Sequence, residues 1–285
     1  MSIRLLKDID SLQRWRAEGR GAQIVLVPTM GALHEGHCEL IRMAREHGDR
    51  VLVSIFVNPL QFNVATDLEN YPRRLDGDLK AAARAGADAV FAPTVESLYP
   101  PGDESRVNVG PLADPLCGQN RPGHFEGVCT IVVKLFMLSG CAAAVFGEKD
   151  FQQLAIVRRV VEDLHLPLEI IAHPTVRDPD GLAMSSRNLR LSEEARKEAL
   201  SIPRALRAAE AAWDEGERQR QRLEAIFRER LSSALNLDYG ELRLPSSLAR
   251  SGEVLTGDQL FAVAAEIDGV RLIDNLLLRD PSSRR

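Results

Sequence analysis

QIVLVPTMGALHEGHCELIRMAR, residues 23–45, is the stretch that determines the fold class. It opens with an apolar run typical of a buried strand, turns after Val27, and continues with apolar residues at helical spacing. Short apolar runs then keep alternating with helical segments along the chain, which is the pattern of parallel β-α-β units. The predicted strands cover residues 23–27, 51–57, 88–92, 142–146 and 168–171.

These units predict an α/β fold with a Rossmann-like, doubly wound parallel sheet that is covered by helices on both faces. The composition changes near residue 188, where dense Arg and Glu accompany Ala and Leu at helical spacing. Further on, the apolar runs 260–267 and 270–278 predict two strands of a small sheet. We therefore predict two domains, a larger one over residues 1–180 and a smaller α+β C-terminal lid domain over residues 181–285.

Charge and cysteine content exclude several classes of protein. The 285 residues include 36 basic and 41 acidic side chains, so the net charge of −5 provides no general attraction for nucleic acid. No apolar run approaches the roughly 18 residues of a membrane span, and the N-terminus does not resemble a secretory signal. Scattered thiols without a C-x-x-C pair favour a reducing compartment, so we expect a cytoplasmic protein; they are Cys38, Cys117, Cys129 and Cys141.

The turn after the first strand of this stretch predicts an anion site. A helix N-terminus presents backbone N–H groups and a positive dipole, and glycines allow a phosphate to approach closely. His34 and His37 lie three residues apart, so both rings can project from one helix face. Each histidine alone would be explained by capping or packing. Their occurrence together at a strand-to-helix junction favours phosphate chemistry, and His37-Cys38 excludes the Lys-Ser/Thr of a P-loop.

Three other strand ends carry polar side chains. Each has a plain structural explanation as a turn or helix cap, but ligands of open α/β sheets bind at the carboxyl ends of strands. The amides can recognise hydroxyl or carboxylate groups, the lysine can contact phosphate, and the serine-arginine loop can close over a triphosphate. These groups are Asn58 with Gln61, Lys149 with Asp150 and Gln153, and the loop from Met184 to Arg187.

The H-x-G-H pattern resembles the signature of class I nucleotidyl-transferring enzymes, and the M-S-S-R loop resembles the K-M-S-K-S loop of that superfamily. A more specific resemblance covers nearly the whole chain. The segments that carry it are PTMGALHEGH (28–37), SIFVNPLQF (54–62), YPR (71–73), RPGHFEGV (121–128), FGEKDFQQL (146–154), DGLAMSSRN (180–188) and RLIDN (271–275). In this order and spacing they resemble the pantothenate synthetase family, the pantoate–β-alanine ligases.

The resemblance implies a two-domain homodimer that forms pantoyl adenylate from pantoate and ATP with Mg²⁺, after which β-alanine displaces AMP. It implies pantoate binding by Asn58, Gln61 and Gln153, and β-alanine binding by Gln61. His37 corresponds to the family's proton donor, and we expect His34, Lys149 and Arg187 to stabilise charge beside it. The implied ATP-binding positions are Met30, Gly31, Ala32, Leu33, His34, Glu35, Gly36, His37, Gly147, Glu148, Lys149, Asp150, Val176, Met184, Ser185, Ser186 and Arg187.

The sequence departs from the family's pattern at two places, and two alternative functions stay open. Relatives tend to have adjacent acidic residues near the metal, whereas here Gly77 separates Asp76 from Asp78, so we do not expect this segment to coordinate Mg²⁺ directly, and the metal ligands stay unassigned. Cys117 stands where relatives more often have Glu. A small-molecule adenylyltransferase that releases its adenylate would share the histidines without needing the amides. A non-catalytic nucleotide-binding regulator would bind ATP without releasing pyrophosphate.

Overall fold

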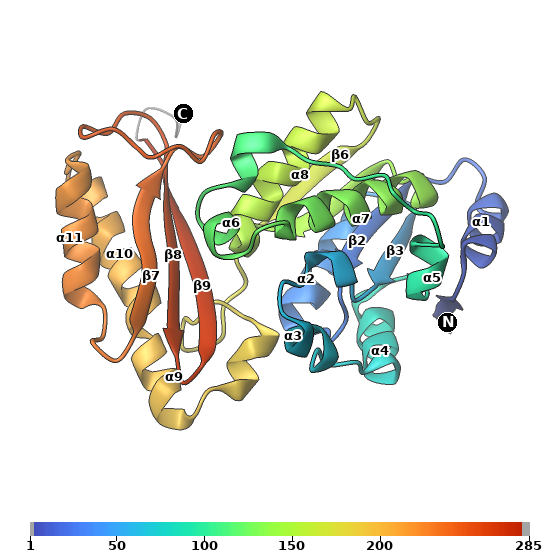
Figure 1. The fold of residues 1–285 in the computed structure, drawn as a ribbon, viewed down its shortest axis with the longest axis horizontal. Helices are drawn as coiled ribbons and strands as arrows, with labels where there is room; N and C mark the ends of the chain where they lie inside the picture. The colour runs from blue at the N-terminus through green and yellow to red at the C-terminus, as the bar shows by residue number, and fades with distance from the viewer. Residues whose placement is uncertain (1–2, 281–285) are drawn as a thin grey trace. The chain divides into compact units, whose positions relative to one another are not determined.

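The computed structural model describes residues 3–280, and in that part of the chain the larger sheet has six parallel strands (Figure 1). Their order is β1-β4-β3-β2-β5-β6. Five of them confirm the predicted strands, and the short edge strand β1, which pairs with β4, was not predicted. The bounds are β1 Arg4–Leu6, β2 Ile24–Thr29, β3 Arg50–Ile55, β4 Ala89–Phe91, β5 Ala143–Gly147 and β6 Glu169–His173.

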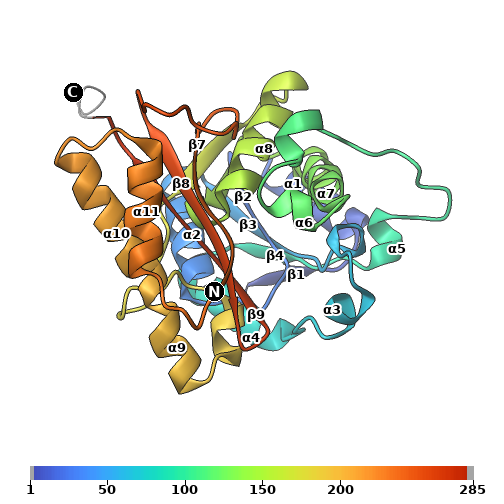
Figure 2. The same cartoon turned by 60° about the vertical axis from the view of Figure 1, so that its left-hand side comes forward.

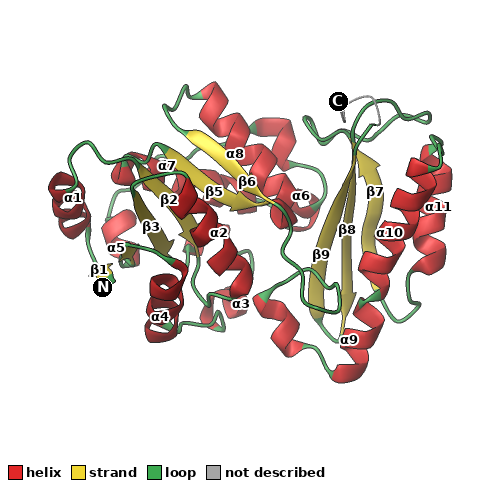
Figure 3. Ribbon diagram, turned by 180° about the vertical axis from the view of Figure 1, so that it is seen from behind, coloured by secondary structure: helices red, strands yellow, loops and turns green. Residues whose placement is uncertain are grey.

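Helices cover both faces of this sheet, which confirms the predicted fold class. Alternate side chains of β2 and β3, such as Val25 and Val51, pack with α2 and α4 in one buried cluster. Helix α7 contacts β2 and α1, and Figures 1 and 3 show α7 and α2 on opposite sides. The helices are α1 Ile9–Glu18, α2 Glu35–Glu46, α3 Ala65–Glu69, α4 Leu75–Ala85, α5 Val95–Leu98, α6 Cys117–Asn120, α7 His124–Ser139 and α8 Phe151–Asp163, with short 3₁₀ turns η1 Pro59–Gln61, η2 Gly110–Ala113 and η3 Glu148–Asp150.

Strand β2 occupies the position that matters for binding. It pairs with β3 on one side and with β5 on the other, so the direction of strand addition reverses beside it. Ligands of open parallel sheets bind beyond the carboxyl ends of the strands at such a reversal. The chain segments that leave β2 and β5 at this end begin with Met30 and Glu148.

The second sheet is antiparallel and, within residues 175–280, has the strand order β7-β8-β9. Strands β8 and β9 confirm the two predicted apolar strands, whereas β7 was not predicted. Helices α10 and α11 lie side by side against this sheet (Figure 2). A Cβ on Gly240 of β7 would lie 2.6 Å from Phe227 Cε1, so the glycine makes room for that ring. The bounds are η4 Ser186–Arg190, α9 Glu193–Ala199, α10 Ser201–Asp214, α11 Arg220–Arg230, β7 Asn236–Arg243, β8 Gln259–Ile267 and β9 Val270–Leu278.

The described chain divides into two compact units. The first comprises the chain up to Glu148 together with Ile156–Pro174. The second comprises Lys149–Ala155 and the chain from Thr175 onward. The predicted domain boundary at residue 180 stays a prediction. No helix among the described residues is both long enough and apolar enough to cross a membrane.

Candidate active site

The turn after β2 has an unusual backbone that polar side chains hold in place. Gly31 and Ala32 have φ angles of 87° and 51°, so two successive residues adopt positive φ. Thr29 Oγ1 donates to the carbonyl of Ser54 on β3 at 2.7 Å and accepts the N–H of Gly31 at 3.1 Å. The turn is therefore fixed to the neighbouring strand before α2 begins.

Four N–H groups of this turn are not open, as the predicted anion site had them. The N–H groups of Ala32 and Leu33 donate to the two carboxylate oxygens of Asp78, at 3.0 and 2.8 Å. The N–H groups on either side, those of Gly31 and His34, are taken by Thr29 Oγ1 and His37 Nδ1. These four donors already have protein acceptors, so they are not open to a phosphate in this structure.

The structure brings the two predicted histidines together at the start of α2. Their ring centroids lie 4.0 Å apart, and His34 is the N-cap residue of the helix. The His34 N–H donates to His37 Nδ1 at 3.3 Å. Because Nδ1 accepts this bond, a neutral His37 carries its proton on Nε2. The tautomer of a neutral His37 is therefore defined.

Asn58 lies at the carboxyl end of β3 and is only 1% exposed. Its Nδ2 donates to the carbonyl of Gly127 at 3.0 Å and to Gln61 Oε1 at 3.1 Å. Its Oδ1 accepts from the Leu60 N–H at 3.3 Å and from the Tyr99 hydroxyl at 2.9 Å. Burial raises the pKa of Tyr99, so the hydroxyl keeps the proton that it donates. All four hydrogen-bonding positions of the Asn58 amide are thus used within the protein.

The orientation of the Gln61 side chain follows from that of Asn58. The Gly127 carbonyl can only accept, so the Asn58 amide cannot be turned over, and Gln61 must direct Oε1 toward it. The other end of the amide, Gln61 Nε2, lies 2.9 Å from Met30 Sδ in the turn after β2. An amide that donates hydrogen bonds is therefore held beside the H-x-G-H segment, as carboxylate or hydroxyl recognition requires.

The RPGHFEGV segment has a structural role in this site that the sequence did not assign. Arg121 and His124 Nδ1 both contact the backbone carbonyl of Gln61, at 3.1 and 2.8 Å. A Cβ on Gly127 would lie 2.8 Å from Gln61 N and would overlap the Leu60 carbonyl. Glycine at this position is what allows α7 to approach η1. The sequence could not predict these contacts, because Arg121 and His124 lie 60 and 63 residues after Gln61 in the chain.

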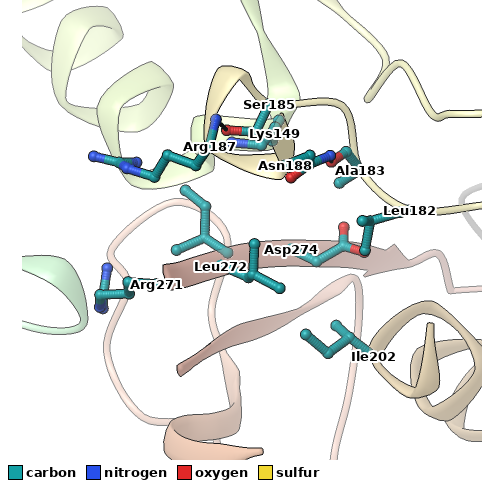
Figure 4. A pocket seen from close by; sticks show the side chains of 11 residues that line it. Lys149, Leu182, Ala183, Ser185, Arg187, Asn188, Ile202, Arg271, Leu272 and Asp274 are labelled. Carbon is teal, nitrogen blue, oxygen red and sulfur yellow. Dashed lines mark hydrogen bonds between the residues drawn. The ribbon is translucent and has the colours of Figure 1, made fainter. Parts of the chain in front are cut away.

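A small pocket in the second unit collects several of the other predicted residues (Figure 4). Lys149, Ser185 and Arg187 line one side of it, and Leu272 and Asp274 of β9 lie opposite. Ser185 Oγ accepts the N–H of Arg187 at 3.2 Å, so the serine caps η4 and shapes the loop. A lysine, a serine and an arginine thus line the same pocket, which suits an anionic ligand.

Strand β9 supports this pocket through the RLIDN segment, another motif without an assigned role. Asp274 accepts two hydrogen bonds from Arg177, at 2.8 and 2.9 Å, and its side chain is 3% exposed. Asn275 donates to the backbone carbonyl of Lys149 at 2.8 Å. The lysine Nζ lies 3.8 Å from Asp150 Oδ2. The Asn275 bond anchors the backbone from which the Lys149 side chain extends.

The remaining predicted positions divide between the two units. Gln153 is partly buried near the start of α8 and belongs to the second unit, whereas Gln61 belongs to the first. The Val176 carbonyl accepts the N–H of Met184 at 2.9 Å, which connects the predicted adenine position to the serine-arginine loop. Among residues 3–280 no group of three His, Cys, Asp or Glu could hold a metal ion.

Comparisons with known proteins find relatives over nearly the whole chain. The family model of pantoate-beta-alanine ligase matches residues 4–277. The pantothenate synthetase of Trichlorobacter lovleyi is 46% identical over 282 residues, which cover 98% of this chain and 99% of that protein.

Solved structures are similar over the same length. The crystal structure of the pantothenate synthetase from Thermus thermophilus has a TM-score of 0.92 at 41% identity and covers 98% of this chain and 100% of its own. The pantoate-beta-alanine ligase from Francisella tularensis, crystallised in complex with beta-gamma ATP and beta-alanine, has a TM-score of 0.80 at 33% identity. In that comparison the coverage is 97% of this chain and 98% of the other.

Proposed function

Because the chain belongs to the pantoate–β-alanine ligase family, we infer that it joins pantoate to β-alanine at the expense of ATP. The observation that carries this function is the fixed amide of Gln61, whose Nε2 lies 2.9 Å from Met30 of the H-x-G-H turn. A donor for a carboxylate is thereby held beside the turn that leads into the two histidines. An adenylyltransferase that releases its adenylate, or a regulator without catalysis, would not need that arrangement.

Pantoate binding is assigned to Gln61 and Gln153, with Asn58 acting through Gln61. The Gln61 Nε2 hydrogens would donate to pantoate, and the same amide would later contact β-alanine. Asn58 holds Gln61 in the donating orientation rather than contacting the substrate itself, since its own hydrogen bonds are used within the protein. This division of roles accounts for the close pair of amides after β3.

Joining a carboxylate to an amine requires a better leaving group than oxide, and adenylation supplies one. A carboxylate oxygen of pantoate attacks the α-phosphorus, the bond to the bridging oxygen of the β-phosphate breaks, and pyrophosphate leaves. His34, His37, Lys149 and Arg187 offset the charge that develops on the phosphates, and His37 presents its Nε2 proton. The amine of β-alanine then attacks the pantoyl carbonyl, AMP leaves, and the nitrogen loses a proton.

The nucleotide is proposed to contact the segments 30–37, 147–150 and 184–187 and the backbone at Val176. Mg²⁺ that accompanies ATP would offset the charge of the phosphates. The chain's own cationic side chains, above all Lys149 and Arg187, meet the oxygens that remain. The homodimer and the cytoplasmic location implied by the sequence stay predictions.

Pyrophosphate release tests this function directly. Purified protein is incubated with ATP and Mg²⁺, with and without pantoate and β-alanine, and pyrophosphate and AMP are followed in parallel. We expect pyrophosphate to require pantoate, and sustained AMP release to require β-alanine as well. Pyrophosphate that forms without pantoate, or AMP that accumulates equally without the amine, would contradict the assignment.

A further inference from the structure

Asp78 connects helix α4 to the turn that carries the catalytic histidines. It lies in the first turn of α4 and is 3% exposed. Its Oδ1 accepts the N–H of Leu33 at 2.8 Å, and its Oδ2 accepts the N–H of Ala32 at 3.0 Å. One buried carboxylate thus binds two successive donors that are 45 and 46 residues earlier in the chain.

The turn needs such a support because its backbone is strained. Ala32 has a φ of 51°, which side chains other than glycine rarely adopt, and such a conformation persists only when its surroundings enforce it. The carboxylate also packs against Gly31, where a Cβ would lie 3.0 Å from Asp78 Oδ2 and from Ile55 Cγ2. Asp78 therefore restrains the turn by hydrogen bonds and by contact.

We propose that Asp78 is a positioning residue for adenylation: its carboxylate takes the backbone donors of the Gly31–Leu33 turn and thereby sets the position of His34 and His37. His34 follows Leu33 directly and caps α2, so a displaced turn moves both rings. This inference rests on the proposed function. It assigns the carboxylate a role in geometry and none in metal binding or proton transfer.

Asp78→Asn is the sharpest test because it keeps the size of the side chain. One oxygen remains as an acceptor, while the amide nitrogen now faces a backbone N–H, and two donors repel each other. Asp76→Asn is the matched control: Asp76 lies in the same first turn of α4 and is exposed, so both changes remove the same charge at the same helix end.

We expect Asp78→Asn to lower kcat for pantoate-dependent pyrophosphate release by about 10- to 100-fold, since misplacement of catalytic groups by about 1 Å has effects of that size. The KM for pantoate should stay within about twofold, because Gln61 is held by separate contacts. Asp76→Asn should behave like the unchanged protein. The assay is run well below the unfolding temperature of each variant, so that a loss of stability alone leaves kcat unchanged.

A second readout does not depend on activity. The chain has six histidines, and side-chain NMR resolves their ring signals. Asp78→Asn should shift the signals of His34 and His37 and leave those of His165 and His173 in place, and Asp76→Asn should shift none. If Asp78→Asn does not fold, Asp78→Glu keeps the charge and displaces it by one methylene, with the same expected loss of kcat and the same shifted signals.

The possible results test the positioning role of Asp78 separately from the proposed ligase function. Unchanged kcat and unchanged His34 and His37 signals in a folded Asp78 variant would overturn the positioning role, as would equal losses in Asp76→Asn. If the unchanged protein releases no pyrophosphate with pantoate, the proposed function fails, and the NMR comparison still decides whether Asp78 positions the histidines.

Discussion

Replacing Asn58 with aspartate should turn over the side-chain amide of Gln61, the group that we assign to pantoate binding. The carboxylate can still accept from Leu60 N–H and from the Tyr99 hydroxyl, but it has no hydrogen to give. The Gly127 carbonyl, 3.0 Å away, loses its side-chain donor and keeps only the helical N–H of α7. Gln61 then relieves the contact of two oxygens by turning Nε2 toward residue 58, which directs Oε1 at the substrate.

The magnitude follows from the bonds that change. Losing one of the two hydrogen bonds to the Gly127 carbonyl costs about 0.5–1.5 kcal/mol of folding stability. At the substrate, a hydrogen bond to a charged carboxylate, worth about 1.5–3 kcal/mol, is replaced by a repulsive contact. That energy corresponds to an increase of about 10- to 150-fold in the KM for pantoate. The KM for ATP should change much less, because the histidines and Lys149 do not depend on this amide.

Two controls separate orientation from charge and from general damage. Asn70→Asp makes the same chemical change at an exposed residue just after α3, so it should leave the KM for pantoate unchanged. Tyr99→Phe removes one bond to Asn58 Oδ1 while the Leu60 N–H keeps the amide in place, so it should cost about 1 kcal/mol of stability without raising this KM.

Initial rates of pyrophosphate release over a range of pantoate concentrations measure KM, and urea unfolding measures stability. Should Asn58→Asp retain its KM for pantoate within twofold, the orientation of Gln61 does not control binding. If Tyr99→Phe raises the KM for pantoate as much as Asn58→Asp does, the increase comes from disruption of the loop. The orientation of Gln61 then does not explain it.

Three further predictions concern other parts of the molecule. Gly127→Ala should destabilise the first unit by about 1–3 kcal/mol through overpacking of α7 on η1, and raise the KM for pantoate; an unchanged urea midpoint would contradict it. Lys149→Ala should lower the rate of pyrophosphate release on the order of 10²–10³-fold, as measured by kcat, while the exposed control Lys197→Ala should not. Burial raises the pKa of Cys129 to about 12, above its ordinary 9.0, so the unfolded thiol ionises first and stability falls as pH rises through this window. The loss is about 1.4 kcal/mol per pH unit, and Cys129→Ala should show a shallower decline in urea unfolding between about pH 9 and 10.5.

The central strands could be predicted because they are buried on both faces and read as unbroken apolar runs. The two strands that escaped prediction lie at sheet edges. β1 has three residues and pairs only with β4. β7 carries Asp238, Gly240 and Glu241, which interrupt the apolar alternation, and it is held by α11 and β8. Tertiary packing determined these two strands, and local sequence carried little of that information.

In the candidate site, too, local sequence predicted positions but not the contacts between residues far apart in the chain. Strand ends that carry polar groups were identifiable because parallel strands bring their carboxyl ends to one edge. The partners that define their chemistry were not: Asp78 meets the turn across 45 residues, and the Gly127 carbonyl meets Asn58 across 69. Sequence alone therefore suggested that the turn's N–H groups were open to a phosphate, whereas a carboxylate with no local signal occupies two of them.

The path of the chain between the two units restricts how such a protein can be taken apart or recombined. Lys149–Ala155 belongs to the second unit although residues of the first precede and follow it. Asn275 anchors this insert through the Lys149 carbonyl. A single cut near residue 180 would leave Lys149 and Gln153 on the wrong fragment, so neither half would be a transferable module. Gene fusions or chimaeras within the family should therefore exchange at least two separate segments of chain to move the second unit intact.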